Sequence, residues 1–277
     1  MVSRGMSSRP VFSRDGSYLY YLLHGDSMGP LTELWRYQMA TGRREAVVTG
    51  FAITDYDVAN ESPEVIFSTQ PPGKLSEIWL AGLDRNTSPR RIASSGEASP
   101  HFGSTGEILF RLSSGGTNYV ARMNRDGSDR AKVAPSPVST VMGISSDRKW
   151  VIAMAPWHGT SGDYMATIAV PVGGGNPRQI CEGFCIPQWA PDGRYLYLPT
   201  AGKTLVIPLE RGEALPKAQA DLAVQSYATA IPGAHVIEGG YESTDYRVRG
   251  LSPSPDPATF AYVRTSVHHN LYQVHLR

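Results

Sequence analysis

The chain has 277 residues, of which 28 are glycine and 21 are proline, and only 18% are charged. Its 26 lysine and arginine residues nearly balance 25 aspartate and glutamate residues, and no basic stripe emerges, so the sequence argues against a nucleic-acid partner. No apolar run reaches the roughly 18 residues of a membrane-spanning helix, and the composition favours many short strands joined by tight turns.

The first predicted element is a β-hairpin near the N-terminus. An apolar strand ends at Phe12, the polar turn Ser13-Arg14-Asp15-Gly16 follows, and a second strand covers 19–22. Aspartate can hydrogen-bond to the turn backbone and glycine adopts a positive φ, so this order is typical of a hairpin. Further strands around 33–35 and 45–48 complete a unit of four antiparallel strands.

The same unit recurs along the chain. When the last apolar residue of each first strand is taken as a marker, the intervals between markers are 46, 44, 42, 45 and 62 residues. Four-stranded units with a period of about 40 to 50 residues are what the blades of a β-propeller show. The six markers are Phe12, Val58, Phe102, Ile144, Trp189 and Leu251.

We therefore predict an all-β fold in a single domain covering 1–277, a six-bladed β-propeller of four-stranded antiparallel blades. The last blade has room for only three strands after residue 243, so residues 1–5 are predicted to supply its outer strand and close the ring. The long interval before the last marker contains an insertion rich in Ala, Gln and Leu, 216–231, which we expect to form one short helix. The predicted blades cover 6–48, 52–93, 96–134, 138–181, 184–240 and 244–277.

Two copies of the hairpin sequence, Pro10–Leu19 and Pro187–Leu196, come closest to the pattern Pro-x-aromatic-Ser-x-Asp-Gly-x-x-Leu. This pattern resembles the WD40-like (PD40) repeat of the TolB family of β-propellers. The stretches 181–198 and 206–213 are most similar to the extracytoplasmic propeller regions of bacterial Ser/Thr kinase-like sensor proteins. The resemblance implies a periplasmic or extracellular location and a larger parent protein, but no single function, since propellers host many.

Residues 1–5 lack the apolar core of a signal peptide, so the chain is either cytosolic or a piece of a longer exported protein. We expect it to be a monomer. The two cysteines, Cys181 and Cys185, are separated by three residues. This spacing leaves open two free thiols, a small disulfide loop or, least suited to a single pair, a zinc site.

Candidate binding residues follow from the geometry of a propeller. A prolyl-oligopeptidase activity would need an α/β-hydrolase domain, for which six blades leave no room in this chain. In a propeller the first strand of each blade lines a central channel, and the connections between blades crowd one mouth of that channel. The polar residues that we predict at this mouth as ligand-binding candidates are Arg9, Asp55, Asp57, Glu97, His101, Gln188, Asp245, Arg247 and Arg249.

Acidic residues from four different blades are predicted to converge on the channel axis. Carboxylates are calcium ligands, and six-bladed propellers of the paraoxonase and gluconolactonase type hold calcium at this place. The asparagine-rich ligand set of those proteins is not recognisable, and the neighbouring arginines favour an anionic ligand or internal ion pairs. The candidate ligands of a divalent metal such as calcium are Asp55, Glu97, Glu182 and Asp245.

Two functions therefore remain. The first is a binding module that takes a protein, a peptide or a small molecule at the channel mouth, which fits the resemblance and the lack of a complete catalytic motif. The alternative is a metal-assisted hydrolase of the phosphotriesterase, lactonase or esterase type, in which a metal in the channel lowers the pKa of a bound water.

Overall fold

The structure is a computed structural model that describes residues 7–24, 32–85, 87–159, 162–199, 203–216, 231–238, 251–254 and 259–262. These residues form five four-stranded antiparallel sheets and one two-stranded sheet, and in each sheet neighbouring strands follow one another in the sequence. The first three sheets, blades 1 to 3, contain β1 (Ser7–Phe12), β2 (Tyr18–His24), β3 (Thr32–Gln38) and β4 (Arg44–Val48); β5 (Ile53–Val58), β6 (Glu64–Thr69), β7 (Glu77–Gly82) and β8 (Arg90–Ala93); and β9 (Ala98–Phe102), β10 (Ile108–Ser114), β11 (Thr117–Met123) and β12 (Ala131–Lys132).

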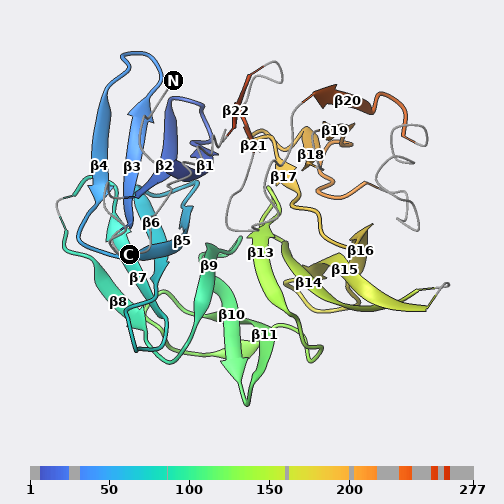
Figure 1. Cartoon of the computed structure of the whole chain (residues 1–277), viewed down its shortest axis with the longest axis horizontal. Coiled ribbons are helices and arrows are strands. Elements are labelled where there is room, and N and C mark those ends of the chain that lie inside the picture. Colours follow the sequence, from blue (N-terminus) through green and yellow to red (C-terminus); the bar gives the residue numbers. More distant parts are fainter. Residues whose placement is uncertain are drawn as a thin grey trace, which may run out of the picture.

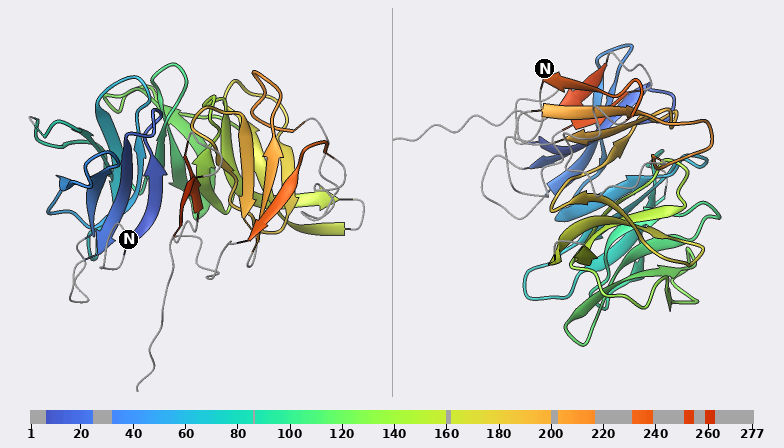
Figure 2. Two further views of the ribbon diagram at one scale, coloured as in Figure 1. Left: turned by 90° about the horizontal axis from the view of Figure 1, so that it is seen from above. Right: turned by 90° about the vertical axis from the view of Figure 1, so that its right-hand side faces the viewer.

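The remaining sheets continue the same order. They contain β13 (Thr140–Ile144), β14 (Trp150–Gly159), β15 (Gly162–Pro171) and β16 (Arg178–Glu182) in blade 4; β17 (Gln188–Trp189), β18 (Tyr195–Pro199), β19 (Lys203–Pro208) and β20 (His235–Glu238) in blade 5; and β21 (Leu251–Pro253) with β22 (Phe260–Tyr262) in the last sheet. The sheets stand around a common axis, as Figure 1 shows, and their strands run along that axis in the side views of Figure 2. The predicted all-β propeller with four-stranded antiparallel blades is therefore confirmed.

The predicted count of six complete blades is wrong for the part of the chain that the structure describes. Five sheets have four strands, and the sixth has only two, β21 and β22. Strand β21 lies in contact with both β1 and β17, between the first and the fifth blades (Figure 1). Residues 1–5 lie outside the described residues, and so does nearly all of the insertion 216–231 that was expected to be helical. No helix occurs among the described residues.

The five markers from Phe12 to Trp189 each end the first strand of their blade, as the repeat predicts. These first strands are not regular, because the pairing of β1 with β2 and of β9 with β10 is interrupted by a register shift. At these points Arg9 and Ser99 adopt φ values of 54° and 51°. A positive φ costs a non-glycine residue about 1–2 kcal/mol, so surrounding contacts must hold both residues in place.

The hydrophobic core lies between neighbouring blades rather than inside any one of them. Leu34 of β3 and Tyr56 of β5 belong to one buried cluster that joins blades 1 and 2, and similar clusters join blades 2 to 5 in succession. Trp189 packs against the cluster between blades 4 and 5, and its indole N–H donates to the carbonyl of Ala214 at 2.7 Å. The aromatic residue of the repeat in blade 5 is thus a packing residue between blades.

The two cysteines form a disulfide, Cys181–Cys185, with a Cα–Cα distance of 6.5 Å. It links the end of β16 to the connection that enters blade 5, and both cysteines are buried. Thr167 of β15 holds the same connection, because its hydroxyl accepts the Cys185 N–H at 3.1 Å and lies 3.0 Å from the Gly183 carbonyl. Of the three states that the spacing left open, the structure contains the disulfide.

Candidate functional site

The centre of the ring contains a cavity of about 140 Å³, which we call the channel cavity. Every first strand contributes to its wall, so this is the channel that the repeat predicts. Each of these strands contributes one or two residues, most of them at or near its last position. The strand residues in its wall are Val11, Phe12, Tyr56, Asp57, His101, Gly143, Ile144, Gln188, Trp189, Ser252 and Pro253.

Three of the predicted binding residues, Asp57, His101 and Gln188, line the channel cavity. His101 is almost fully buried, and its Nδ1 lies 4.0 Å from Oδ2 of Asp57. Gln188 is half-buried on the far side of the ring, at the start of β17. The structure thus brings these three polar residues, from three different blades, to one cavity.

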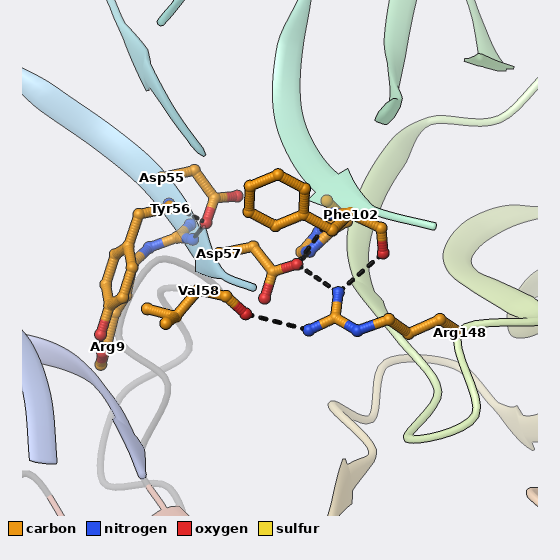
Figure 3. A network of polar contacts seen from close by, with 8 residues as sticks. Arg9, Asp55, Tyr56, Asp57, Val58, Phe102 and Arg148 are labelled. Atoms are coloured by element: carbon orange, nitrogen blue, oxygen red, sulfur yellow. Dashed lines mark hydrogen bonds and ion pairs between the residues drawn. The ribbon is translucent and has the colours of Figure 1, made fainter. Parts of the chain in front are cut away.

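Asp57 is held by an arginine from another blade, as Figure 3 shows. Nη1 of Arg148 donates to Oδ2 of Asp57 at 2.6 Å and to the carbonyl of Phe102 at 2.7 Å, while Nη2 donates to the carbonyl of Val58 at 3.0 Å. The N–H of Phe102 donates to the same carboxylate oxygen at 2.9 Å. Arg148 belongs to blade 4, so this network ties blades 2, 3 and 4 together beside the channel axis.

Arg148 occupies an unusual place in the repeat. It follows Asp147 in the turn between β13 and β14, where blades 1 and 5 have Gly16 and Gly193 after their aspartates. Those glycines have φ values of 73° and 72°, and Arg148 keeps the same backbone conformation with a φ of 58°. A non-glycine residue in this region is strained, which indicates that the arginine side chain has a role that glycine lacks.

The network lowers the pKa of Asp57. Burial raises the pKa of this carboxyl group, but the charges of Arg148 and His101 and the hydrogen bonds from Arg148 and Phe102 lower it further than burial raises it. The pKa of Asp57 therefore lies below its usual value, and the carboxylate remains charged at neutral pH. Its charge is balanced by the guanidinium of Arg148.

Arg9 and Asp55 form a separate ion pair that lines neither the channel cavity nor the larger cavity described below. Both side chains are less than 10% exposed. The hydroxyl of Tyr56 donates to the Arg9 carbonyl at 2.6 Å, and the Tyr56 N–H donates to the Asp55 carboxylate at 2.9 Å. These contacts hold Arg9 in its positive-φ conformation and join blades 1 and 2.

The carboxylates predicted to share a metal are not brought together. Asp55 pairs with Arg9, and the fully buried Glu97 pairs with Arg130, which also donates to a carbonyl of β8. Glu182 is exposed at the end of β16. No group of three or more His, Cys, Asp or Glu residues in the described part of the chain could hold a metal ion. Two of the three described carboxylates are thus already neutralised by arginine, and this set does not fit a shared cation.

Three predicted site residues, Asp245, Arg247 and Arg249, lie outside the described residues. So does a pattern with the Gly-x-Ser-x-Gly form of a hydrolase nucleophile elbow, Gly25-Asp26-Ser27-Met28-Gly29. That pattern connects β2 and β3, two antiparallel strands of one blade. A nucleophile elbow instead needs a turn from a strand into a helix, so the pattern does not point to an esterase site.

A larger cavity of about 680 Å³, which we call the funnel, opens at the end of the channel where the first strands finish. Its wall is built from the turns that connect the first and second strands of blades 1 to 5, and we call this end the turn face. The sequence prediction placed the binding site at the opposite mouth, where the blades are connected. The turn residues in the funnel wall are Arg14, Ala59, Asn60, Glu61, Ser62, Gly103, Ser104, Thr105, Gly106, Ser146, Asp147, Arg148, Pro191, Asp192 and Gly193.

The funnel was missed because the turns were treated only as markers of the fold. One signal in the sequence pointed to them: the glycine of the repeat is replaced by Arg148 in blade 4.

Comparison with solved structures identifies the same fold. The chain is similar to a putative TolB from Agrobacterium tumefaciens, with a TM-score of 0.64 and 16% identity over 95% of this chain and 91% of that one. TolB from Acinetobacter baumannii gives a TM-score of 0.59 and 16% identity; the match covers 74% of this chain and about half, 52%, of that one. A chain of a nidogen–laminin complex gives 0.53 and 13% identity, over 74% of this chain and 76% of that one.

No protein-family model matches the sequence, and no curated protein matches it either. Identities of this size establish the architecture and nothing beyond it. No helix in the described residues is long and apolar enough to cross a membrane. The chain thus has the fold of the TolB-like β-propellers.

Proposed function

We propose that the protein is a non-catalytic binding module, and that its ligand is a peptide segment held in the funnel on the turn face. The observation that carries this proposal is the funnel itself. Its volume of about 680 Å³ falls within the roughly 300–1,000 Å³ of ligand sites, and five blades contribute to it. Turns on a rigid scaffold are suited to recognition because their side chains vary without disturbing the sheets.

The chemistry of the wall favours a polar chain over an apolar small molecule. Apart from Ala59, Phe102 and Pro191, the wall consists of charged, hydroxyl-bearing, amide-bearing and glycine residues. Such a surface offers both donors and acceptors to a peptide backbone. Two similar structures support a role in protein recognition, since one comes from a nidogen–laminin complex and another is the propeller domain of a Pyrococcus furiosus protease with a TM-score of 0.50.

The alternative function, a metal-assisted hydrolase, has no comparable observation behind it. Asp57, which lines the channel cavity, is paired with Arg148, and Asp55 and Glu97 are paired with other arginines. A carboxylate that is neutralised by a guanidinium is a poor ligand for a cation and a poor general base.

We further propose that the protein works in an oxidising compartment, as the periplasm or the outside of the cell would be, within a larger parent protein. The disulfide Cys181–Cys185 supports this location, because disulfides persist in such compartments and are rare in the cytosol. We also infer a ring of six blades, because β21 occupies the position of a first strand between β1 and β17.

Selection from a random peptide library displayed on phage tests the proposal. Selected peptides would be titrated by calorimetry against the wild type and against Ser104→Trp, which places a large side chain on an exposed turn of the funnel wall. Ser94→Trp is the matched control, because Ser94 is also exposed but lies on the connection between blades 2 and 3, at the other mouth.

We expect Ser104→Trp to weaken binding by about tenfold or more and Ser94→Trp to leave it unchanged, since a blocked pocket loses well over 1.4 kcal/mol of contacts. Equal binding to all three proteins, or loss only with Ser94→Trp, would place the ligand away from the funnel and overturn the proposal.

A further inference from the structure

The funnel and the channel cavity adjoin at a group of residues that we call the neck. It is defined by the residues that line both cavities: Arg14, Asn60, Ser146, Arg148 and Pro191. These residues come from the turns of blades 1, 2, 4 and 5, so the neck lies on the propeller axis. Whatever enters the funnel and reaches its floor meets this ring of side chains.

The neck carries a net positive charge and several hydrogen-bond donors. The guanidinium of Arg148 is balanced by Asp57, but the exposed Arg14 side chain makes no ion pair with any residue that the structure describes. Asn60 adds an amide and Ser146 a hydroxyl. Guanidinium, amide and hydroxyl donors together form a site for an anionic oxygen group, above all for a carboxylate.

The rim of the funnel has the opposite charge. Glu61, Asp147 and Glu213 line the funnel without lining the channel cavity, and none of them forms an ion pair with another described residue. The other charged rim residues are compensated, since Asp192 pairs with Arg194 and Arg125 pairs with Glu64. From rim to floor, the funnel therefore changes from acidic to basic.

The space beneath the neck limits how far a chain can continue. The channel cavity, at about 140 Å³, is much smaller than the funnel, at about 680 Å³. A chain end fits this smaller space more readily than a continuous polypeptide does. An amino terminus would be repelled by Arg14, whereas a carboxyl terminus would be attracted to it.

We propose that the neck binds the C-terminal carboxylate of a peptide, and that the acidic rim binds basic side chains a few residues before that end. This inference rests on the proposed function and specifies its ligand: a free C-terminus that enters the funnel first. Arg14 is the main specificity-determining residue. Arg148 shapes the floor of the neck while its charge remains paired with Asp57.

Affinity selection with mass-spectrometric readout tests this inference. Two pooled hexapeptide libraries of the same composition are offered to the full chain, one with free C-termini and one with amidated C-termini. We expect the wild type to retain the free acids about tenfold more strongly, since one charge-assisted contact is lost on amidation. Lysine and arginine should be enriched at inner positions of the retained peptides.

Arg14→Gln removes the uncompensated charge at the neck and should abolish the preference for free acids. Arg43→Gln is the control, because Arg43 is an exposed turn arginine of blade 1, outside the funnel wall, and should keep the preference. Both positions are exposed, so both variants are expected to fold.

Each other outcome overturns the inference. If acids and amides are retained equally, and Ser104→Trp still blocks both, the funnel binds peptides without reading their C-termini, and the proposed function survives alone. If the free acids are retained as well by Arg14→Gln as by the wild type, their carboxylate is bound elsewhere. If neither library is retained, both the inference and the proposed peptide ligand fail.

Discussion

Arg148 donates to the Asp57 carboxylate at 2.6 Å across the turn face, from blade 4 to blade 2 (Figure 3). It does so from a backbone position where blades 1 and 5 have glycine. The strain of this turn is thus offset by a contact between blades that are not neighbours. Arg148 lines both the funnel and the channel cavity, so this contact links the funnel wall to a residue of the channel.

Arg148→Gly should destabilise the protein by about 2–4 kcal/mol. Removal of one partner of a largely buried ion pair costs about 3–5 kcal/mol, and the relief of a positive φ returns about 1 kcal/mol or slightly more. Denaturant unfolding of both proteins measures the difference in the free energy of unfolding.

Asp57→Asn and the double variant complete a mutant cycle that isolates the pair. A coupling free energy near zero would show that the two side chains do not stabilise each other. An Arg148→Gly variant as stable as the wild type would show that the contact does no more than offset the strain of the turn.

The acid sensitivity of folding should depend on Asp57. Its pKa is lower in the folded than in the unfolded protein, so its contribution to stability is complete above about pH 4–5 and is lost as the pH falls through the folded pKa. Asp57→Asn should therefore lose less unfolding free energy between pH 5 and pH 2 than the wild type does, by about 1.4 kcal/mol for each unit of pKa shift.

The measurement is urea unfolding at several pH values. Asp15 and Asp126 also have lowered pKa values but are untouched in both proteins, so they affect both curves equally. Parallel curves for wild type and Asp57→Asn would contradict this account of the network.

Removal of one partner of the buried Arg9–Asp55 pair should destabilise the protein strongly, whereas replacement of both partners by apolar residues should destabilise it little. Asp55→Ala leaves the Arg9 guanidinium buried without its carboxylate and should cost about 3–5 kcal/mol. The double variant Arg9→Met, Asp55→Leu removes both charges and should recover most of this loss, as thermal or denaturant unfolding would show. A double variant no more stable than Asp55→Ala would mean that the pair is needed for more than charge balance.

Reduction of Cys181–Cys185 should lower stability modestly. The bond closes a loop with a sequence separation of only four residues, for which loop-closure entropy gives about 2 kcal/mol. Unfolding of the wild type with and without dithiothreitol measures this. A Cys181→Ala, Cys185→Ala variant should not respond to the reductant. If the reductant also leaves the unfolding free energy of the wild type unchanged, the bond is absent in solution or does not stabilise the fold.

The fold could be predicted because its signal repeats. Each of the first five markers ends a strand, Phe102 and Trp189 pack between blades, and a spacing of 42–46 residues occurs four times in succession. The last sheet could not be predicted as well, because its marker Leu251 begins β21 instead of ending a strand.

The candidate site was harder to predict because it depends on contacts between distant blades. The sequence placed Asp57, His101 and Gln188 at the channel, where they lie, and left internal ion pairs open as an alternative. It did not indicate that Asp55 would pair with Arg9 or Glu97 with Arg130. Pairings at sequence separations of 33 and 46 residues leave no local pattern. The funnel needs five turns in place at once, which only the closed arrangement of blades provides.

Hydrogen–deuterium exchange of the full chain, with and without a peptide selected on it, tests the central claim most directly. If the ligand occupies the funnel, exchange should slow in the turns 59–62, 103–106, 146–148 and 191–193 while the connections between blades are unchanged. Slower exchange confined to the connections 49–52, 94–97, 135–139 and 183–187 would place the ligand at the opposite mouth of the channel and contradict the account.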